Sequence, residues 1–438
     1  MGKLKIVTML AGILFVGAPA LVQAYQIAPN PNPWGSTISV ITLDAENLSG
    51  FANSGTLLID GGSLNNSGIL NNGGTLMDWG VLNNAGILSN SGTLDNYGSM
   101  SNDGILSNSG TLGNYGSMSN DGVINNSGTF SGGGDLINTG TLINTGTSSI
   151  VYVTNMGTLI NSGGMRGAER IVNAGTLNNN VGGSVTLSVN SGLDNSGTLN
   201  NAGILDNSND VSSVSNTGTL TNTGTLTNNC NYCLLFNSGA LTNSGTIAGT
   251  GHYIQTAGQI TNNGSMTQSS IAINGGSLSG TGTITGNVTI GSGASVNPGN
   301  SPGAMTINGD FTSGGTMVFE IAGLGTGLYD VLNINGNALF TGGNIQFDFI
   351  NGFNAAAGNY WDFLTANTVT GWDSLGFSFN GLGTGLGWNF TQLTSGGERL
   401  MIGSNSVSPV PEPETYAMLL AGLGLLGFIA SRKKNLCV

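Results

Sequence analysis

The chain has 438 residues, of which 76 are glycine and only 29 carry a charge, 8 basic and 21 acidic. So few basic residues exclude nucleic-acid binding by neutralisation of phosphates, which needs a basic face. An apolar content of 38% argues against an acidic disordered chain, and glycine lacks the every-third-residue spacing of collagen. The composition is typical of a repetitive β protein with little charge.

The first 24 residues have the pattern of a secretory signal peptide. Lys3 and Lys5 supply a positive start, Ile6–Phe15 is apolar, and small residues precede a cleavage site after Ala24. A retained membrane anchor is the alternative, and it is disfavoured because the apolar stretch is short. We expect residues 1–24 to be absent from the mature fold.

A six-residue repeat begins after the N-terminal segment. From Gly62 to Gly146 a glycine occupies every sixth position, an apolar residue follows two positions later, and asparagine usually follows two positions after that. Side chains alternate along a strand, so the apolar residue and the asparagine share one face. Each unit predicts a short strand and a turn, in which glycine tolerates positive φ. Stacked coils would bury a leucine column and align asparagine ladders at the corners.

A longer period defines the coil. Residues 89–106 and 107–124 are identical at 15 of 18 positions, so three hexapeptides form one turn of a three-sided prism. Trp79, Tyr97 and Tyr115 align at the same 18-residue offset.

Later coils are longer. Their glycines are 21 residues apart, at Gly197, Gly218 and Gly239, which predicts two regular sides and extra residues on the third. We expect an all-β β-solenoid of about 18–21 residues per coil and roughly 12–13 coils over residues 50–296. Strict hexapeptides suggest a left-handed helix, whereas 21-residue coils resemble the right-handed helices of filamentous adhesins, so the hand stays open.

Both ends of the array need a cap, because terminal coils expose strand edges. Residues 25–49 are the expected N-terminal cap. After residue 297 the hexapeptide pattern stops, and residues 297–403 are expected to form an all-β C-terminal cap or small sandwich, followed by a linker at 404–414. The expected strands of this domain are Thr316–Ile321, Asp330–Ile334, Asn344–Phe349 and Tyr360–Leu364.

The C-terminal tail, residues 415–438 with the linker before it, has three ordered elements. They are Val410, Pro411, Glu412 and Pro413, then the apolar run Tyr416–Ala430, then Arg432, Lys433 and Lys434. The run is long enough only for a short transmembrane helix. This arrangement resembles the PEP-CTERM sorting signal of Gram-negative bacteria, a tail that has also been labelled an ice-binding protein C-terminal motif.

The resemblance implies a route and partners. An exosortase, an inner-membrane cysteine transpeptidase, would cut near Pro-Glu-Pro after Sec export and pass the protein to the cell surface or medium. Members of the family are typically associated with exopolysaccharide and biofilm. Removal of both signals would leave three arginines against 19 acids, a net charge of about −16. Such a body does not capture DNA or anionic lipid electrostatically.

Cys230 and Cys233 form the strongest chemical pattern in the body. In an exported chain a structural disulfide is favoured. Zinc is the alternative, but His252 is the only histidine, so further ligands are lacking. Cys437 lies beyond the sorting signal. We expect no metal and no cofactor.

Catalytic candidates are few. His252 lacks an accompanying nucleophile motif, and Glu169 between Arg166 and Arg170 is the only mixed-charge cluster in the array, equally consistent with a solvated loop. Asp103 and Asp121 should stack at one corner, but two carboxylates cannot supply the 6–8 oxygen ligands that Ca²⁺ requires. We therefore expect that the protein is not an enzyme.

Two surface columns are candidate binding faces. A threonine column could order water as in ice-binding β-helices, although paired Thr-x-Thr occurs only at places such as Thr219 and Thr221, and threonine is a good strand former anyway. The column comprises Thr75, Thr93, Thr111, Thr129 and Thr147. An apolar column could mark a partner or lateral packing surface. It comprises Ile69, Ile87, Ile105 and Val123.

These patterns favour a secreted, non-enzymatic β-solenoid at the cell surface or in the extracellular matrix. Its expected role is structural or adhesive, with exopolysaccharide or other copies of itself as partners and with exosortase as the processing enzyme. An ice-binding or adhesin β-helix is the alternative, and a polysaccharide-active β-helix enzyme is a more distant one.

Overall fold

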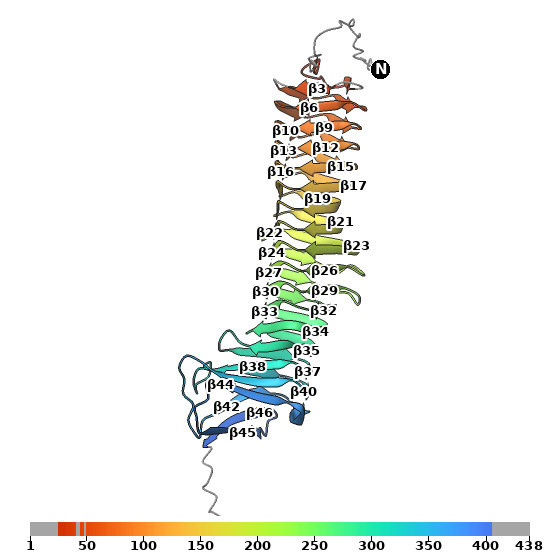
Figure 1. The fold of residues 1–438 in the computed structure, drawn as a ribbon. Coiled ribbons are helices and arrows are strands. Elements are labelled where there is room, and N and C mark those ends of the chain that lie inside the picture. Colours follow the sequence, from red (N-terminus) through yellow and green to blue (C-terminus); the bar gives the residue numbers. More distant parts are fainter. Residues whose placement is uncertain (1–24, 41–43, 48–49, 405–438) are drawn as a thin grey trace, which may run out of the picture.

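The computed structural model describes residues 25–40, 44–47 and 50–404. These residues form a long rod of stacked β coils, about 15 turns in all (Figure 1). Apart from the short 3-10 helix η1 (Trp372–Ser374), every regular element is a strand. The predicted β-solenoid is therefore confirmed, whereas the expected signal peptide and the C-terminal tail lie outside the described residues.

Each coil has three sides, and equivalent strands of successive coils pair in parallel. Side 1 contains β2 (Thr37–Val40), β5 (Thr56–Ile59), β8 (Thr75–Asp78), β11 (Thr93–Asn96), β14 (Thr111–Asn114), β25 (Ile204–Asp206), β28 (Thr225–Thr227), β31 (Thr246–Ala248), β36 (Ala304–Asn308), β39 (Val331–Ile334) and β42 (Tyr360–Thr365). Side 2 contains β3 (Asp44–Asn47), β6 (Ser63–Asn66), β9 (Val81–Asn84), β12 (Ser99–Asn102), β15 (Ser117–Asn120), β26 (Ser213–Asn216), β29 (Leu234–Asn237), β32 (His252–Gln255), β37 (Phe311–Ser313), β40 (Asn337–Phe340) and β43 (Thr368–Thr370).

The third side is the most regular. Side 3 contains β4 (Phe51–Asn53), β7 (Ile69–Asn72), β10 (Ile87–Asn90), β13 (Ile105–Asn108), β16 (Val123–Asn126), β18 (Thr141–Asn144), β20 (Thr158–Asn161), β22 (Thr176–Asn179), β24 (Thr198–Asn201), β27 (Thr219–Asn222), β30 (Ala240–Asn243), β33 (Gln259–Asn262), β38 (Thr316–Ile321), β41 (Asn344–Phe349) and β44 (Gly376–Asn380). Six longer strands pass over corners. They are β17 (Thr129–Asn138), β19 (Thr147–Asn155), β21 (Gly164–Asn173) and β23 (Ser184–Asn195) on sides 1 and 2, and β34 (Ser265–Gly280) and β35 (Thr283–Pro298) on all three.

The core is a shaft of apolar side chains, one from each strand. On side 3, Leu70, Leu88 and Leu106 pair in register and are completely buried. Each contributes roughly 1.5–3 kcal/mol relative to exposure, so stability is spread over the coils and not concentrated in one centre.

Asparagine ladders line the corners inside the coil, as the six-residue pattern predicts. The Nδ2 of Asn72 donates to Oδ1 of Asn90 at 2.7 Å and to the backbone oxygen of Thr93 at 2.7 Å. Asn90 repeats both contacts with the next coil along the chain. Because these amides are buried, the ladder satisfies groups that would otherwise cost about 1–3 kcal/mol each.

The recurrent glycines are required by close backbone contact, which corrects the expectation of positive φ. A Cβ atom on Gly92 would lie 2.1 Å from the backbone oxygen of Gly74, and one on Gly110 would lie 2.1 Å from that of Gly92. None of these three glycines has a positive φ. Coils can therefore stack at the spacing of a β-sheet only if these corner residues have no side chain.

The stacking begins inside the expected N-terminal cap. The strands β2 and β3 already pair with β5 and β6, and Asn32 starts a ladder by donating to Asn53 at 2.7 Å. The short strand β1 (Tyr25–Gln26) pairs with β3. Residues 25–49 thus contain a first coil as well as a cap.

The 21-residue coils place their extra residues at the corner between sides 1 and 2. The loops 207–212 and 228–233 project there, while the flanking strands stay in register, with Leu205 opposite Leu226 and Val214 opposite Leu235. Figure 1 shows these loops protruding from the rod beside β26 and β29.

The C-terminal segment is all-β but continues the coils instead of forming a separate sandwich. Equivalent core residues are now farther apart in sequence, with Met305 opposite Leu332 and Leu332 opposite Leu364. Longer connections erase the six-residue pattern while the register persists, which explains why the array exceeds the 12–13 coils expected. The antiparallel strands β45 (Leu386–Gln392) and β46 (Glu398–Ser404) close the end, and β46 pairs with β42.

Candidate functional site

The threonine column lies on side 1 and is longer than the sequence indicated. The five expected threonines pair in register, and Thr37 and Thr56 extend the column toward the N-terminus. Their side chains are partly or fully exposed. The second outward column on this side holds Met77, Asp95 and Gly113, so the threonines form a single file.

Stacked aromatic rings border this column. The ring centroids of Trp79 and Tyr97 are 4.2 Å apart, and those of Tyr97 and Tyr115 are 4.9 Å apart, with nearly parallel planes. A Cβ on Gly113 would lie 2.7 Å from the Tyr115 ring, so that ring covers the glycine. Burial raises the pKa of Asp95 in the same column. The rings lie beside the threonine column and not in it, and in these coils no second threonine column accompanies it, whereas the ice-binding alternative depends on paired threonines.

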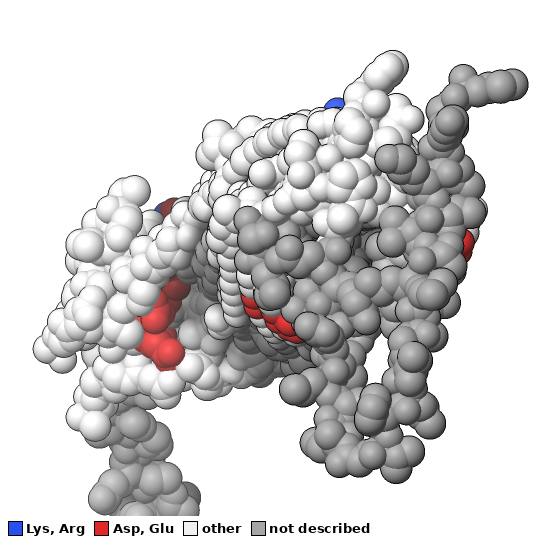
Figure 2. Space-filling model, turned by 90° about the horizontal axis from the view of Figure 1, so that it is seen from above, with Lys and Arg blue, Asp and Glu red and all other residues white. Residues whose placement is uncertain are grey.

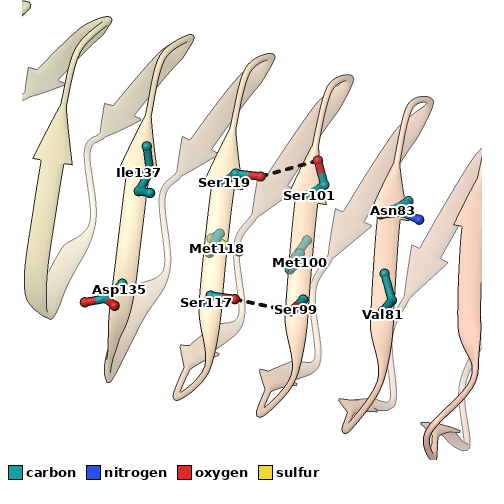
Figure 3. A pocket seen from close by; sticks show the side chains of 10 residues that line it. All are labelled: Val81, Asn83, Ser99, Met100, Ser101, Ser117, Met118, Ser119, Asp135 and Ile137. Carbon is teal, nitrogen blue, oxygen red and sulfur yellow. Dashed lines mark hydrogen bonds between the residues drawn. The ribbon is translucent and has the colours of Figure 1, made fainter.

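A shallow hollow of about 300 Å³ lies on side 2 (Figure 3). Ser99 pairs with Ser117 and Ser101 with Ser119, at oxygen separations of 3.3 and 3.4 Å. Larger residues bound the hollow at both ends in the axial direction. They are Val81 and Asn83 at one end and Asp135 and Ile137 at the other. This surface can exchange hydrogen bonds with hydroxyl groups, but it brings together no acid–base pair.

The structure joins Cys230 and Cys233 in a disulfide within the loop before β29. The Sγ of Cys233 is buried and lies 3.3 Å from the backbone oxygen of Asn209 and 3.5 Å from Oγ of Ser212 in the preceding loop. The disulfide therefore closes a turn within one projecting loop, and Sγ of Cys233 packs against the preceding loop. Among the described residues no group of three or more His, Cys, Asp or Glu could hold a metal ion.

The mixed-charge cluster separates in the structure. Glu169 accepts a hydrogen bond of 2.7 Å from the hydroxyl of Tyr152, while Arg170 pairs with Asp194 at 2.9 Å. Arg166, Glu169 and Arg170 are exposed. Such exposed pairs stabilise by at most about 1 kcal/mol, and the arrangement is that of a solvated surface.

His252 lies at the start of β32, with Nδ1 2.7 Å from Oγ of Ser270 in the next coil. No hydrogen bond among the described residues joins this imidazole to a carboxylate. Sequence reasoning did not place Ser270 beside the histidine, because the pair depends on the register of β32 and β34. Without an orienting acid, the pair lacks the third member of a nucleophile–base–acid arrangement.

Asp103 and Asp121 occupy one corner column between sides 2 and 3. Ser101 donates to Asp103 at 3.3 Å, and the hydroxyl of Thr139 donates to Asp121. Each of the two carboxylates therefore accepts a hydrogen bond from a nearby hydroxyl group.

Sequence reasoning did not predict the burial of two acids, Asp78, which replaces a single asparagine of the repeat, and Asp330, which lies beyond the repeat. Burial raises the pKa of Asp78 to about 6, at an asparagine position of the side 1 ladder. Burial also raises the pKa of Asp330 to about 7, although its carboxylate accepts hydrogen bonds from the backbone nitrogens of Gly303 at 2.7 Å and Glu320 at 2.8 Å. Asp330 ties the turn before β36 to β38.

The comparison with protein families identifies one segment. Residues 409–434 match the PEP-CTERM protein-sorting motif, which includes the Pro-Glu-Pro element, the apolar run and the basic cluster. No curated protein matches the chain. The motif implies an exported protein that is processed by an exosortase and passes through a membrane-anchored intermediate. Among the described residues no helix is long and apolar enough to cross a membrane.

Proposed function

We propose that the protein is a non-enzymatic structural or adhesive rod of the cell surface or extracellular matrix of a Gram-negative bacterium, associated with exopolysaccharide. The sorting motif at 409–434 carries this proposal, because it addresses a rigid β-solenoid to the exterior.

The surface chemistry supports the same role. Columns of serine, threonine and asparagine run along the rod, and they offer donors and acceptors at the ~4.8 Å spacing of the coils. The acidic body disfavours phosphates and acidic polymers, so a neutral polysaccharide fits it best. Seen from the N-terminal end, acidic side chains gather in rows with few basic ones among them (Figure 2).

The role is tested by deletion of the gene and complementation. We expect deletion to reduce the retained matrix several-fold, and the wild-type chain to restore it. A chain with Pro411→Ala, Glu412→Ala and Pro413→Ala should accumulate as the membrane-bound precursor and fail to restore the matrix. Undiminished matrix after deletion would refute the structural role.

The enzyme alternative is separated by two further variants. If the rod is not an enzyme, Glu169→Gln and His252→Gln chains should complement as well as the wild type, since Glu169 bonds the hydroxyl of Tyr152 and His252 that of Ser270. Loss of sugar-fragment release from matrix polymers in either variant would favour the enzyme instead.

A further inference from the structure

Side 3 carries no charge over most of the rod. None of its twelve strands from β4 to β33 contains Asp, Glu, Lys or Arg. The other two sides do carry charged strand residues, such as Asp95 on side 1 and Asp135 and Asp194 on side 2. On a body with a net charge of about −16, side 3 is therefore the face on which two copies can approach with least repulsion.

The surface of side 3 consists of a ridge beside a groove. Ile69, Ile87 and Ile105 form the ridge, with exposed fractions of 47%, 40% and 41%. The neighbouring outward column contains Ser89 and Ser107, which line a hollow of about 340 Å³. The two columns lie two residues apart along each strand, about 7 Å. Exposed isoleucines in register over several coils form an apolar strip.

We propose that side 3 is a self-association surface, on which a second copy of the chain packs with its rod parallel to the first. A two-fold axis along the rods sets the isoleucine ridge of each copy into the serine groove of the other. Both copies have the same coil spacing, so the contact made at one coil repeats at the next, as in the dry interface between paired sheets.

The acidic corner favours parallel over antiparallel rods. Asp103 and Asp121 border side 3 next to the isoleucine ridge, whereas Ser109 and Ser127 border it next to the groove. In the parallel pair each aspartate faces a serine hydroxyl of the second copy, which can donate to it. Antiparallel rods would bring the two ridges and the two acidic corners together, with like charges opposed.

The required area explains why the whole side takes part. A four-residue strand is about 13 Å long, so the four coils with isoleucine or valine in the ridge offer only about 250 Å² per copy. Twelve strands offer about 750 Å² per copy, which is the size of a standard stable interface. From β18 to β27 the ridge column continues with threonine methyl groups, and it ends with Ala240 and Gln259. Ile143 and Ile160 add apolar surface in the neighbouring column.

Pairing deepens the proposed structural role, on which it rests, because it names the partner of the rod. Ile105→Asp should weaken pairing at least ten-fold, because it buries a charge in each half of the interface. Ile204→Asp is the matched control, since Ile204 lies on side 1 and is 50% exposed. Sedimentation of the full chain in mild detergent should show dimers for the wild type and for Ile204→Asp, and at least ten-fold weaker association for Ile105→Asp. Equal association of all three would overturn the proposal.

Cross-linking tests the arrangement without disturbing the ridge. Ser107→Cys and Thr242→Cys, each in a Cys437→Ser background, place one thiol on side 3 at two positions that are seven coils apart. In parallel rods, a short bismaleimide should link each variant to itself. Ser101→Cys on side 2 is the control and should remain unlinked.

Each outcome decides. Absence of linkage at both side 3 positions overturns the pairing, and linkage only when different single-cysteine variants are mixed overturns the parallel arrangement. These results do not depend on the matrix. If the deletion strain loses matrix but the purified cysteine variants do not link, the pairing is refuted and the structural role stands. If the variants link but the deletion strain retains its matrix, the structural role is refuted and the pairing stands.

Discussion

Asp78 is the residue at which the asparagine ladder is interrupted. It pairs in register with Asn96, and its Oδ1 accepts a hydrogen bond from the backbone nitrogen of Gly80 at 2.9 Å. The Oδ2 of Asp78 and the Oδ1 of Asn96 are both buried without a partner, while Nδ2 of Asn96 donates onward to Asn114. At this step of the ladder two acceptor oxygens, Oδ2 of Asp78 and Oδ1 of Asn96, occupy the positions where other coils have a donor and an acceptor. A proton on Asp78 supplies the missing donor.

Asp78→Asn should stabilise the protein at neutral pH and not at acidic pH. The folded-state pKa of about 6 lies above the ordinary aspartate pKa of 3.8, so the contribution of protonated Asp78 is complete below pH 3.8 and is lost as the pH rises through 6. The loss at neutral pH is about 3 kcal/mol. An asparagine amide donates at every pH, so urea unfolding should show a gain of up to about 3 kcal/mol at pH 7.5 and little change near pH 4.

The control for this pH dependence is Asp103→Asn, which changes an exposed acid in a neighbouring coil. It should leave the stability difference between the two pH values nearly as in the wild type. An equal change in the free energy of unfolding on Asp78→Asn at both pH values would contradict the proposal that a proton on Asp78 supplies the missing donor.

At the scale of the element, the unit of this fold is the 18-residue coil. The coil formed by residues 89–106 buries one leucine or methionine per side. Its strands pair in register with those of an almost identical coil at 107–124, so each column of side chains continues. Nearest-neighbour contacts dominate in such a stack. One coil can therefore be removed without changing the environment of those that remain.

Deletion of residues 89–106 should leave the fold intact. It joins β10 to the following coil with the same register and shortens the rod by ~4.8 Å, so the circular dichroism should keep its β signature and the melting temperature should fall by only a few degrees. Deletion of residues 89–97 is the control. Nine residues move later leucines to the outward face, because side chains alternate with a period of two, and cooperative unfolding should be lost.

The same elements show what the sequence could predict. Leu88 and Asn90 were placed correctly, because their burial follows from alternation within each strand and from the coil period. The role of Gly92 was misassigned, since the contact that excludes a Cβ lies in another coil. The cover of Tyr115 over Gly113 and the position of Ser270 beside His252 depend on side-chain direction and register, which a local pattern does not contain.

The limit of prediction at the C-terminal end has a different cause. Beyond residue 297 the connections between equivalent strands vary in length, so no period survives in the sequence although the parallel register continues through β38, β41 and β44. The four strands expected there are present, because alternation within a strand does not depend on the length of the loops. Alternation predicts strands, whereas a fixed period is needed to predict their stacking.

At the scale of the whole molecule, electrostatic repulsion between the acidic sides opposes association of the rods. The body carries a net charge of about −16, while the twelve strands of side 3 from β4 to β33 are uncharged. Pairing through that side gains from apolar contact and loses from long-range repulsion between the acidic sides. Added salt screens the repulsion, since the Debye length falls from about 30 Å at 0.01 M to about 3 Å at 1 M. It leaves apolar contact undiminished.

Association of the rods should therefore strengthen with salt. Between 0.02 and 0.5 M NaCl we expect sedimentation of the full chain to show a several-fold rise in the association constant of the dimer. The rise should be largely complete once the Debye length is shorter than the separation of the charged sides. An interface held by ion pairs would weaken over the same range. Ile105→Asp should associate at least ten-fold more weakly than the wild type at every salt concentration, because salt does not remove the desolvation penalty of a charge in the interface. A wild-type dimer that dissociates as salt rises would show that charged groups, and not side 3, hold the copies together.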